Sequence, residues 1–165
     1  MPSLHIICGP VASGKTTYAR QLAQEKLAVL LSLDEAMLKL YGVIDGREAF
    51  LAKQDLCRRY LLDLAADSLR NKVPVVLDWG FWKHQDRLAL VARFAQYGCP
   101  IEMIYLKTEA ELRWQRLTMR NQNPGDDNHI IERRDFEFFN SLFEVPRAAD
   151  YPGVNFHLVE TVDGP

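Results

Sequence analysis

The sequence predicts a three-layer α/β/α domain built on a five-stranded parallel sheet. Short apolar runs alternate along the chain with longer segments of helical periodicity, which is the pattern of repeated βα units. The apolar runs are nearly continuous, as in strands that helices cover on both faces. Because no linker or internal repeat interrupts the 165 residues, we expect one domain over residues 1–165.

The expected elements set the positions of the candidate site residues. Strands are expected at 4–8, 27–32, 73–78, 101–106 and 154–159. Helices are expected at 15–25, 47–71, 83–97, 109–121 and 129–144, with a shorter one over "EAMLKLYG". Right-handed crossovers bring the loops that follow parallel strands to one edge of the sheet, where ligands bind in such folds. The residues directly after each strand are therefore the candidates.

Composition limits the possible partners and compartments. The formal net charge is −2 and the isoelectric point is about 6.1, so no global attraction to nucleic acid or to an acidic membrane is expected. Three widely spaced cysteines without a CxxC pattern do not indicate zinc or a disulfide framework. The start "MPSLHIICG" has neither a basic region nor a long apolar segment, so we expect no signal peptide there, and no apolar run has the length of a membrane span. We expect a cytoplasmic protein and leave its oligomeric state open.

The most specific motif follows the first strand. "GPVASGKTT" matches G-x-x-x-x-G-K-[ST], the phosphate-binding P-loop, and lies between an apolar run and a helical segment. Glycines allow backbone amides to turn toward phosphate oxygens, and the helix adds its amino-terminal dipole. The alternative is a glycine-containing turn that only caps a helix. The predicted nucleotide site comprises Gly9, Pro10, Val11, Ala12, Ser13, Gly14, Lys15, Thr16 and Thr17.

Within this loop, Lys15 is expected to contact the outer phosphates of ATP, and Thr16 to offer its hydroxyl to Mg²⁺. A P-loop does not define a reaction. The guanine-specifying NKxD pattern is missing, which argues against a GTPase, and a mechanochemical ATPase domain needs a longer chain. Kinases of small substrates fit this length.

Two carboxylates follow predicted strands. Asp78 ends "VVLD", an arrangement that places a carboxylate near Mg²⁺ in P-loop proteins; the alternative is a helix cap or turn. Asp34 follows the second strand and is expected to accept the proton of an attacking hydroxyl. Its alternative is to cap the following helix. We favour the chemical role for both residues.

The segment "ELRWQRLTMRN" carries arginines at helical spacing. Arg116 and Arg120 are expected to clamp phosphates and to stabilise transition-state charge. For Arg113 alone, a solvated face with Glu109 as its partner is the favoured reading. The turn-rich "NQNPGDDN" follows at 121–128. An arginine helix plus a polar loop predicts a closing lid at about 109–128, which would exclude water from the reaction.

An aromatic cluster follows Asp78 directly in "VVLDWGFW". Trp79, Phe81 and Trp82 lie on the predicted ligand edge and could form a wall for a flat or apolar acceptor near Asp34. The alternative is that at least one of them packs inward beneath the following helix, which "WKHQDR" is expected to begin.

The order of these motifs resembles that of small P-loop kinases, from the first strand to about Pro146. The chain resembles the kinase domain of phage polynucleotide kinase and zeta-toxin-like and chloramphenicol-phosphotransferase-like bacterial proteins. The resemblance implies that Asp34 is the general base, that Asp78 belongs to the active site, and that Arg116 and Arg120 are the lid arginines.

The chain departs from polynucleotide kinase at Met37, where that kinase has an arginine. We therefore expect an ATP- and Mg²⁺-dependent kinase whose acceptor is a hydroxyl on a small molecule, such as an antibiotic or a metabolite. A polynucleotide or tRNA 5′-hydroxyl kinase is the first alternative, so nucleic acid is the less favoured partner. A non-catalytic binding module controlled by nucleotide is the second.

Overall fold

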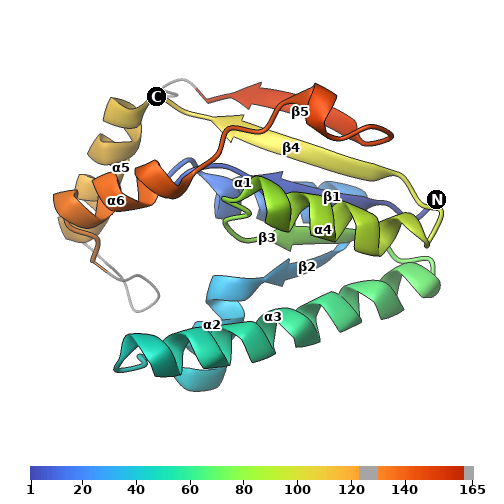
Figure 1. Ribbon diagram of the computed structural model, residues 1–165, viewed down its shortest axis with the longest axis horizontal. Helices are drawn as coiled ribbons and strands as arrows, with labels where there is room; N and C mark the ends of the chain where they lie inside the picture. Colours follow the sequence, from blue (N-terminus) through green and yellow to red (C-terminus); the bar gives the residue numbers. More distant parts are fainter. Residues whose placement is uncertain (123–129, 162–165) are drawn as a thin grey trace.

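In the computed structural model, which describes residues 1–122 and 130–161, five parallel strands form one sheet (Figure 1). The strands are β1 (Leu4–Cys8), β2 (Val29–Ser32), β3 (Val75–Asp78), β4 (Ile101–Lys107) and β5 (Asn155–Glu160). Their order across the sheet is β2-β3-β1-β4-β5. The predicted fold class and parallel sheet are confirmed, and each strand begins and ends within two residues of its predicted bounds.

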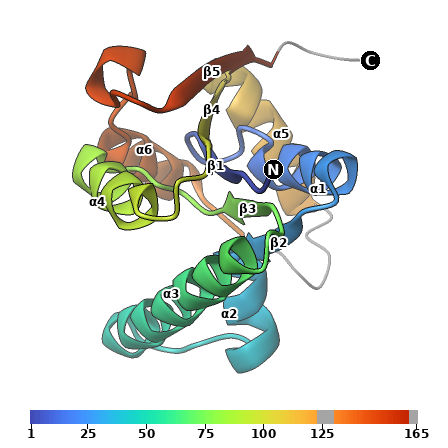
Figure 2. The same cartoon turned by 90° about the vertical axis from the view of Figure 1, so that its right-hand side faces the viewer.

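Helices cover both faces of this sheet. They are α1 (Lys15–Lys26), α2 (Leu33–Tyr41), α3 (Arg47–Arg70), α4 (His84–Ala95), α5 (Ala110–Gln122) and α6 (Arg133–Leu142), with a short 3₁₀ helix at Ala148–Asp150. Figure 2 shows α1 and α5 on one side of the sheet, α4 and α6 on the other, and α2 and α3 beside β2. The helix predicted at 129–144 begins later, at Arg133, and ends earlier. Residues 123–129, which include most of the predicted lid loop, and residues 162–165 lie outside the described residues.

The core is divided into two clusters by the sheet. Ala19 and Ala23 of α1 pack against Val76 of β3. The larger cluster joins residues of α3 and α4, such as Leu61 and Leu90, to the other face. Because side chains alternate along a strand, consecutive residues of β3 contact opposite layers.

The fifth strand corrects one expectation. Its apolar run predicted a strand covered on both faces, but β5 is one of the two edge strands, and Leu158 is 53% exposed. Phe156 and Val159 are only partly buried against the two core clusters. An apolar run alone does not distinguish a central strand from an edge strand.

The carboxyl ends of the strands lead toward the end of the molecule that carries α5 and α6 (Figure 1). This edge carries the loops after β1, β2, β3 and β4. No helix in the part of the chain that the structure describes has the length and apolar character needed to cross a membrane.

Candidate functional site

The phosphate loop connects β1 to α1, as predicted, and two of its glycines have different physical roles. Gly14 has φ 91°, in the left-handed region, and is the residue from which α1 begins. Gly9 allows a close approach instead, because a Cβ there would lie 2.7 Å from Ser13 Oγ and 2.9 Å from the Leu106 carbonyl oxygen. Both positions therefore depend on glycine, one for its backbone conformation and the other for space.

Lys15 is the first residue of α1 and is held inside the loop. Its Nζ donates a hydrogen bond to the Pro10 carbonyl oxygen at 2.7 Å. Burial lowers the pKa of Lys15 to about 8, while the carboxylates of Asp78 and Asp34 act in the opposite direction. A cation that is poorly solvated in this way would be stabilised by an anion entering the loop.

Asp78 ends β3 with a carboxylate that is only 4% exposed. Burial raises the pKa of Asp78, and this rise is opposed by hydrogen bonds from the Thr16 and Ser32 hydroxyls and by the charge of Lys15. The alternative of a helix cap is wrong for Asp78, because α4 begins at His84. The structure thus brings together Thr16 and Asp78, the two residues predicted to hold Mg²⁺.

Asp34 lies in the first turn of α2. The helix begins at Leu33 with Ser32 as its cap, so the alternative in which Asp34 caps the helix is wrong. The Asp34 carboxylate is exposed, and its charge acts to raise the pKa of both Lys15 and Asp78. The ends of β1, β2 and β3 therefore contribute one electrostatically connected group of ionisable side chains.

Arg113 corrects the expectation of a solvated face. The side chain is buried, and its Nη1 donates to the Val11 carbonyl oxygen at 3.1 Å and to Asn140 Oδ1 at 2.6 Å. Its Nε donates to the Thr108 carbonyl oxygen at 3.1 Å. The pairing with Glu109 fails because this face of α5 packs against the phosphate loop and α6 instead of facing water. Arg113 thus connects the phosphate loop to both α5 and α6.

Arg116 and Arg120 lie one and two turns further along α5. Neither makes a hydrogen bond or an ion pair with another residue that the structure describes. Burial lowers the pKa of Arg120, whose Nε is shielded from solvent. Unlike Arg113, these two guanidinium groups have no partner among residues 1–122 and 130–161, which is the property expected of arginines that bind an anion.

Helices α5 and α6 form one arm, to which we refer as the lid arm. Asn121 hydrogen-bonds the backbone of Ile131 with both its amide nitrogen and its oxygen, at 2.8 Å and 3.3 Å. The rings of Trp114 and Phe136 lie 5.3 Å apart between the helices. Helix α6, which the sequence interpretation placed outside the predicted lid at about 109–128, is therefore packed against the helical part of that segment.

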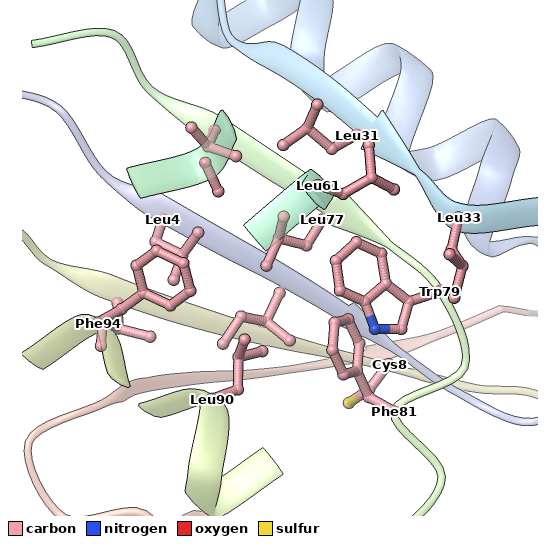
Figure 3. Close-up of a cluster of buried hydrophobic side chains, with 14 of the residues drawn as sticks. Leu4, Cys8, Leu31, Leu33, Leu61, Leu77, Trp79, Phe81, Leu90 and Phe94 are labelled. Carbon is pink, nitrogen blue, oxygen red and sulfur yellow. The ribbon is translucent and has the colours of Figure 1, made fainter. Parts of the chain in front are cut away.

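Of the three aromatic residues after Asp78, two pack inward. Trp79 and Phe81 are 5% and 6% exposed, and their ring centroids lie 4.7 Å apart. Figure 3 shows Trp79 beside Leu33, with Phe81 next to it on the same side of the sheet. The inward-packing alternative is therefore confirmed for both, and only a small part of each ring remains exposed.

Trp82 differs from this pair, because it is half-buried against the lid arm. Its ring lies 5.4 Å from that of Phe139 in α6. A Cβ on Gly80 would lie 2.6 Å from Trp82 Nε1, so the indole rests directly on this glycine. Of the predicted acceptor wall, Trp82 alone keeps a partly open position at the ligand edge.

Arg87 is a site-forming residue that the sequence interpretation missed. It is fully buried in α4 and donates to the Phe81 carbonyl oxygen at 2.6 Å, to the Glu144 carbonyl oxygen at 2.7 Å and to Tyr151 Oη at 2.6 Å. These bonds hold Phe81 at φ 44° and join the aromatic segment to the chain after α6. One sequence signal could have indicated its burial: Arg87 lies three residues before Leu90, which places it on the apolar face of the helix.

Comparisons with protein families and with solved structures agree with this geometry. The family described as an AAA domain matches residues 4–146. A solved candidate kinase from Chloroflexus aurantiacus is 21% identical, with a TM-score of 0.74, and the match covers 96% of this chain and 85% of that one. None of the curated proteins matches the chain in sequence.

Two further solved structures share the fold at lower identity. A gluconokinase from Sinorhizobium meliloti is 16% identical, with a TM-score of 0.64 over 99% of this chain and 85% of that one. A chain of the Pnkp1/Rnl/Hen1 RNA repair complex is 19% identical, with a TM-score of 0.69 over 86% of this chain and 43% of that one. The predicted resemblance to small P-loop kinases is therefore confirmed at the level of family and fold, and nucleotide binding follows from it.

Proposed function

The chain belongs to the AAA-domain family of P-loop proteins, and from this premise we propose that it is an ATP- and Mg²⁺-dependent kinase acting on a hydroxyl of a small-molecule acceptor. One observation carries the proposal. Lys15, Asp34 and Asp78 come from loops or ends of three strands, and they interact electrostatically at a single edge of the sheet. A module that only binds nucleotide needs the lysine, but it has no use for a carboxylate positioned to accept a proton.

The nucleotide side of the site fits ATP and Mg²⁺. The amides of the loop from Gly9 to Thr17 and the Lys15 ammonium would bind phosphate oxygens. Thr16 and Asp78 would hold the metal, because Mg²⁺ is commonly bound by one or two carboxylates together with substrate phosphates. When bound, Mg²⁺ neutralises charge on the transferred phosphoryl group.

Asp34 would act on the acceptor side. Its carboxylate accepts the hydroxyl proton while the acceptor oxygen bonds to the γ-phosphorus and the bond from that phosphorus to ADP breaks. Arg116 and Arg120 supply positive charge to the phosphoryl oxygens, since neither is engaged by a described residue. The lid arm can exclude water from this step, which prevents wasteful hydrolysis of ATP.

A screen for acceptor-dependent turnover tests the proposal. ATP labelled at the γ-phosphate is incubated with Mg²⁺ and a panel of hydroxylated metabolites and antibiotics, and transfer of label and release of ADP are both recorded. We expect label on at least one small acceptor and its loss in Lys15→Ala, with the variant still folded by circular dichroism. Full ATP-dependent activity in Lys15→Ala would contradict the assignment of the site.

The same screen separates the alternatives. An oligonucleotide with a 5′-hydroxyl end tests the polynucleotide kinase, whose affinity for its substrate would fall as salt rises. ATP binding without ADP release, whichever hydroxyl compound is offered, would indicate a nucleotide-controlled binding module. We expect neither outcome.

A further inference from the structure

A pocket of about 240 Å³ lies between α3 and α4, on the side of the sheet opposite α1. Its lining includes Arg58 and Leu62 of α3, Asp86 and Leu90 of α4, and the aromatic pair Trp79 and Phe81. We propose, resting on the kinase function above, that this pocket binds a carboxylate of the acceptor and that Arg58 is the residue that recognises it. The acceptor would then be a hydroxy acid.

Arg58 differs from the arginines around it. Arg59 pairs with Asp55 at 3.1 Å, Arg70 with Asp67 at 2.5 Å, and Arg93 with Asp63 at 2.6 Å. Within residues 1–122 and 130–161, Arg58 makes neither a hydrogen bond nor an ion pair, and its Nε is shielded from solvent. A partly buried guanidinium without an acceptor is unfavourable, and an anion in the pocket would supply the missing acceptor.

The other charges of the pocket leave Arg58 as the dominant one. Arg93 also lines the pocket, but it is neutralised by its ion pair with Asp63. Asp86 is exposed to water and lies in the first turn of α4, where the helix dipole and solvent stabilise a carboxylate. The balance favours an anion at Arg58 over a cation.

The size and lining of the pocket define the rest of the ligand. Trp79, Phe81, Leu62 and Leu90 offer an apolar surface that suits a ring or a carbon skeleton. A single planar guanidinium matches one carboxylate with two parallel hydrogen bonds. A dianionic phosphate would have one cation only, and it would face the carboxylate of Asp86 as well. The chemistry therefore points to a carboxylate.

The strand register connects this pocket to the reacting groups. Ser32 of β2 pairs with Asp78 of β3, so Leu33 and Trp79 follow side by side, as Figure 3 shows. Asp34 is one residue beyond Leu33. Trp79, where the aromatic wall of the pocket begins, thus directly follows Asp78 and lies beside Leu33, the residue before Asp34. An acceptor anchored at Arg58 would extend past Trp79, with its hydroxyl toward Asp34.

A binding experiment tests the pocket without requiring turnover. The probes are benzoate, its neutral counterpart benzyl alcohol, and the dianion phenyl phosphate, followed by saturation-transfer NMR and tryptophan fluorescence. We expect benzoate to bind best and Arg58→Gln to weaken its binding at least tenfold. The matched control Arg59→Gln, one residue away and already ion-paired, should change the affinity less than twofold. Equal binding of benzoate and benzyl alcohol, equal effects of the two variants, or tighter binding of phenyl phosphate would each overturn the proposal.

A kinetic experiment then tests whether the pocket serves the acceptor. Hydroxy acids are compared with their methyl esters, which remove the negative charge without changing the protein and so avoid any dependence on the folding of a variant. For the wild type, we expect esterification to lower kcat/KM at least tenfold. In Arg58→Gln, acid and ester should be used equally, with the KM for ATP unchanged.

The two proposals fail in different ways. If hydroxy acids and neutral alcohols are turned over alike in wild type and Arg58→Gln, the kinase function stands and the role of the pocket is wrong. If no hydroxyl compound is phosphorylated, the kinase function is wrong, and the benzoate experiment still decides whether Arg58 binds a carboxylate.

Discussion

Asp78 and Trp79 are neighbours in the chain, but they serve opposite layers of the sheet. The Asp78 carboxylate accepts a hydrogen bond from Thr16 of α1, and Trp79 packs in the cluster formed with α3 and α4. The alternation of side chains along β3 therefore divides one short segment between a nucleotide side and the proposed acceptor side. This division is the reason that a carboxylate can be followed directly by a cluster of aromatic residues.

The two sides also differ in how their cations are held. On the nucleotide side, Lys15 has the Pro10 carbonyl oxygen as a partner and the carboxylate of Asp78 nearby. On the acceptor side, Arg58 has no hydrogen-bonding partner among the described residues. If the two sides are independent, a substitution on one side should leave ligand binding on the other side unchanged.

The largest effect is expected for Asp34→Asn. Loss of the proton acceptor should lower kcat by about 10²- to 10⁴-fold, while the KM for ATP changes only a few-fold. Single-turnover transfer of labelled phosphate measures this. The matched control is Glu35→Gln, since Glu35 is adjacent and already paired with Lys39 at 2.6 Å. An equal loss in both variants would mean that the first turn of α2, and not the Asp34 carboxylate, is what matters.

The nucleotide side was predictable from sequence because it is local. Residues 9–17 contain the whole loop, so the spacing of Gly9, Gly14 and Lys15 records the geometry directly. Asp78 could be assigned because strand ends share one edge of a parallel sheet. The orientation of Trp79 was not assigned, although alternation from the buried run before it carried that information.

The next effect concerns pH and Lys15. Because burial lowers its pKa to about 8, the ammonium that attracts phosphate is present below pH 8 and is lost above it. Affinity for ATP, measured without added metal, should therefore be nearly constant up to about pH 7, fall about twofold by pH 8, and then fall by up to about tenfold per pH unit. Lys15→Arg should bind without this decline, because arginine stays protonated. The same decline in that variant would assign the titration to another group.

A smaller effect is expected for Arg113→Lys, which tests the connection between the nucleotide side and the lid arm. Lysine cannot reproduce the fork that reaches Val11, Thr108 and Asn140 together. Leaving one of these buried acceptors without its donor should lower the free energy of unfolding by about 1–3 kcal/mol. The KM for ATP should rise about fivefold, because the loop loses its support.

Chemical denaturation and initial rates measure these two quantities. The control is Arg134→Lys, at an exposed position of α6, which should change the free energy of unfolding by less than about 0.5 kcal/mol. A normal KM for ATP together with lowered stability would make Arg113 a structural residue without influence on the nucleotide.

The environments of three arginines could not be predicted from the sequence. Arg58, Arg87 and Arg113 all lie on predicted helices, and charged residues on helices are usually solvated. Their positions depend on which helix packs against which loop, and that is set by residues far away in the sequence. Arg87 donates across 57 positions to Glu144, and Arg113 across 102 positions to Val11. No local pattern contains that information.

The smallest effect is expected at Trp82, where the acceptor side meets the lid arm. Its contact with Phe139 is of a kind worth about 0.5–1.5 kcal/mol, so Trp82→Ala should raise the KM for the acceptor roughly two- to tenfold. Trp82→Phe keeps an aromatic ring and should stay within about twofold, since Nε1 has no hydrogen-bonding partner among the described residues. Initial rates at saturating ATP give the acceptor KM, and the converse experiment gives the KM for ATP. If the KM for ATP rises as much as that for the acceptor, Trp82 belongs to both sides, and the division made at Asp78 and Trp79 does not extend to the lid arm.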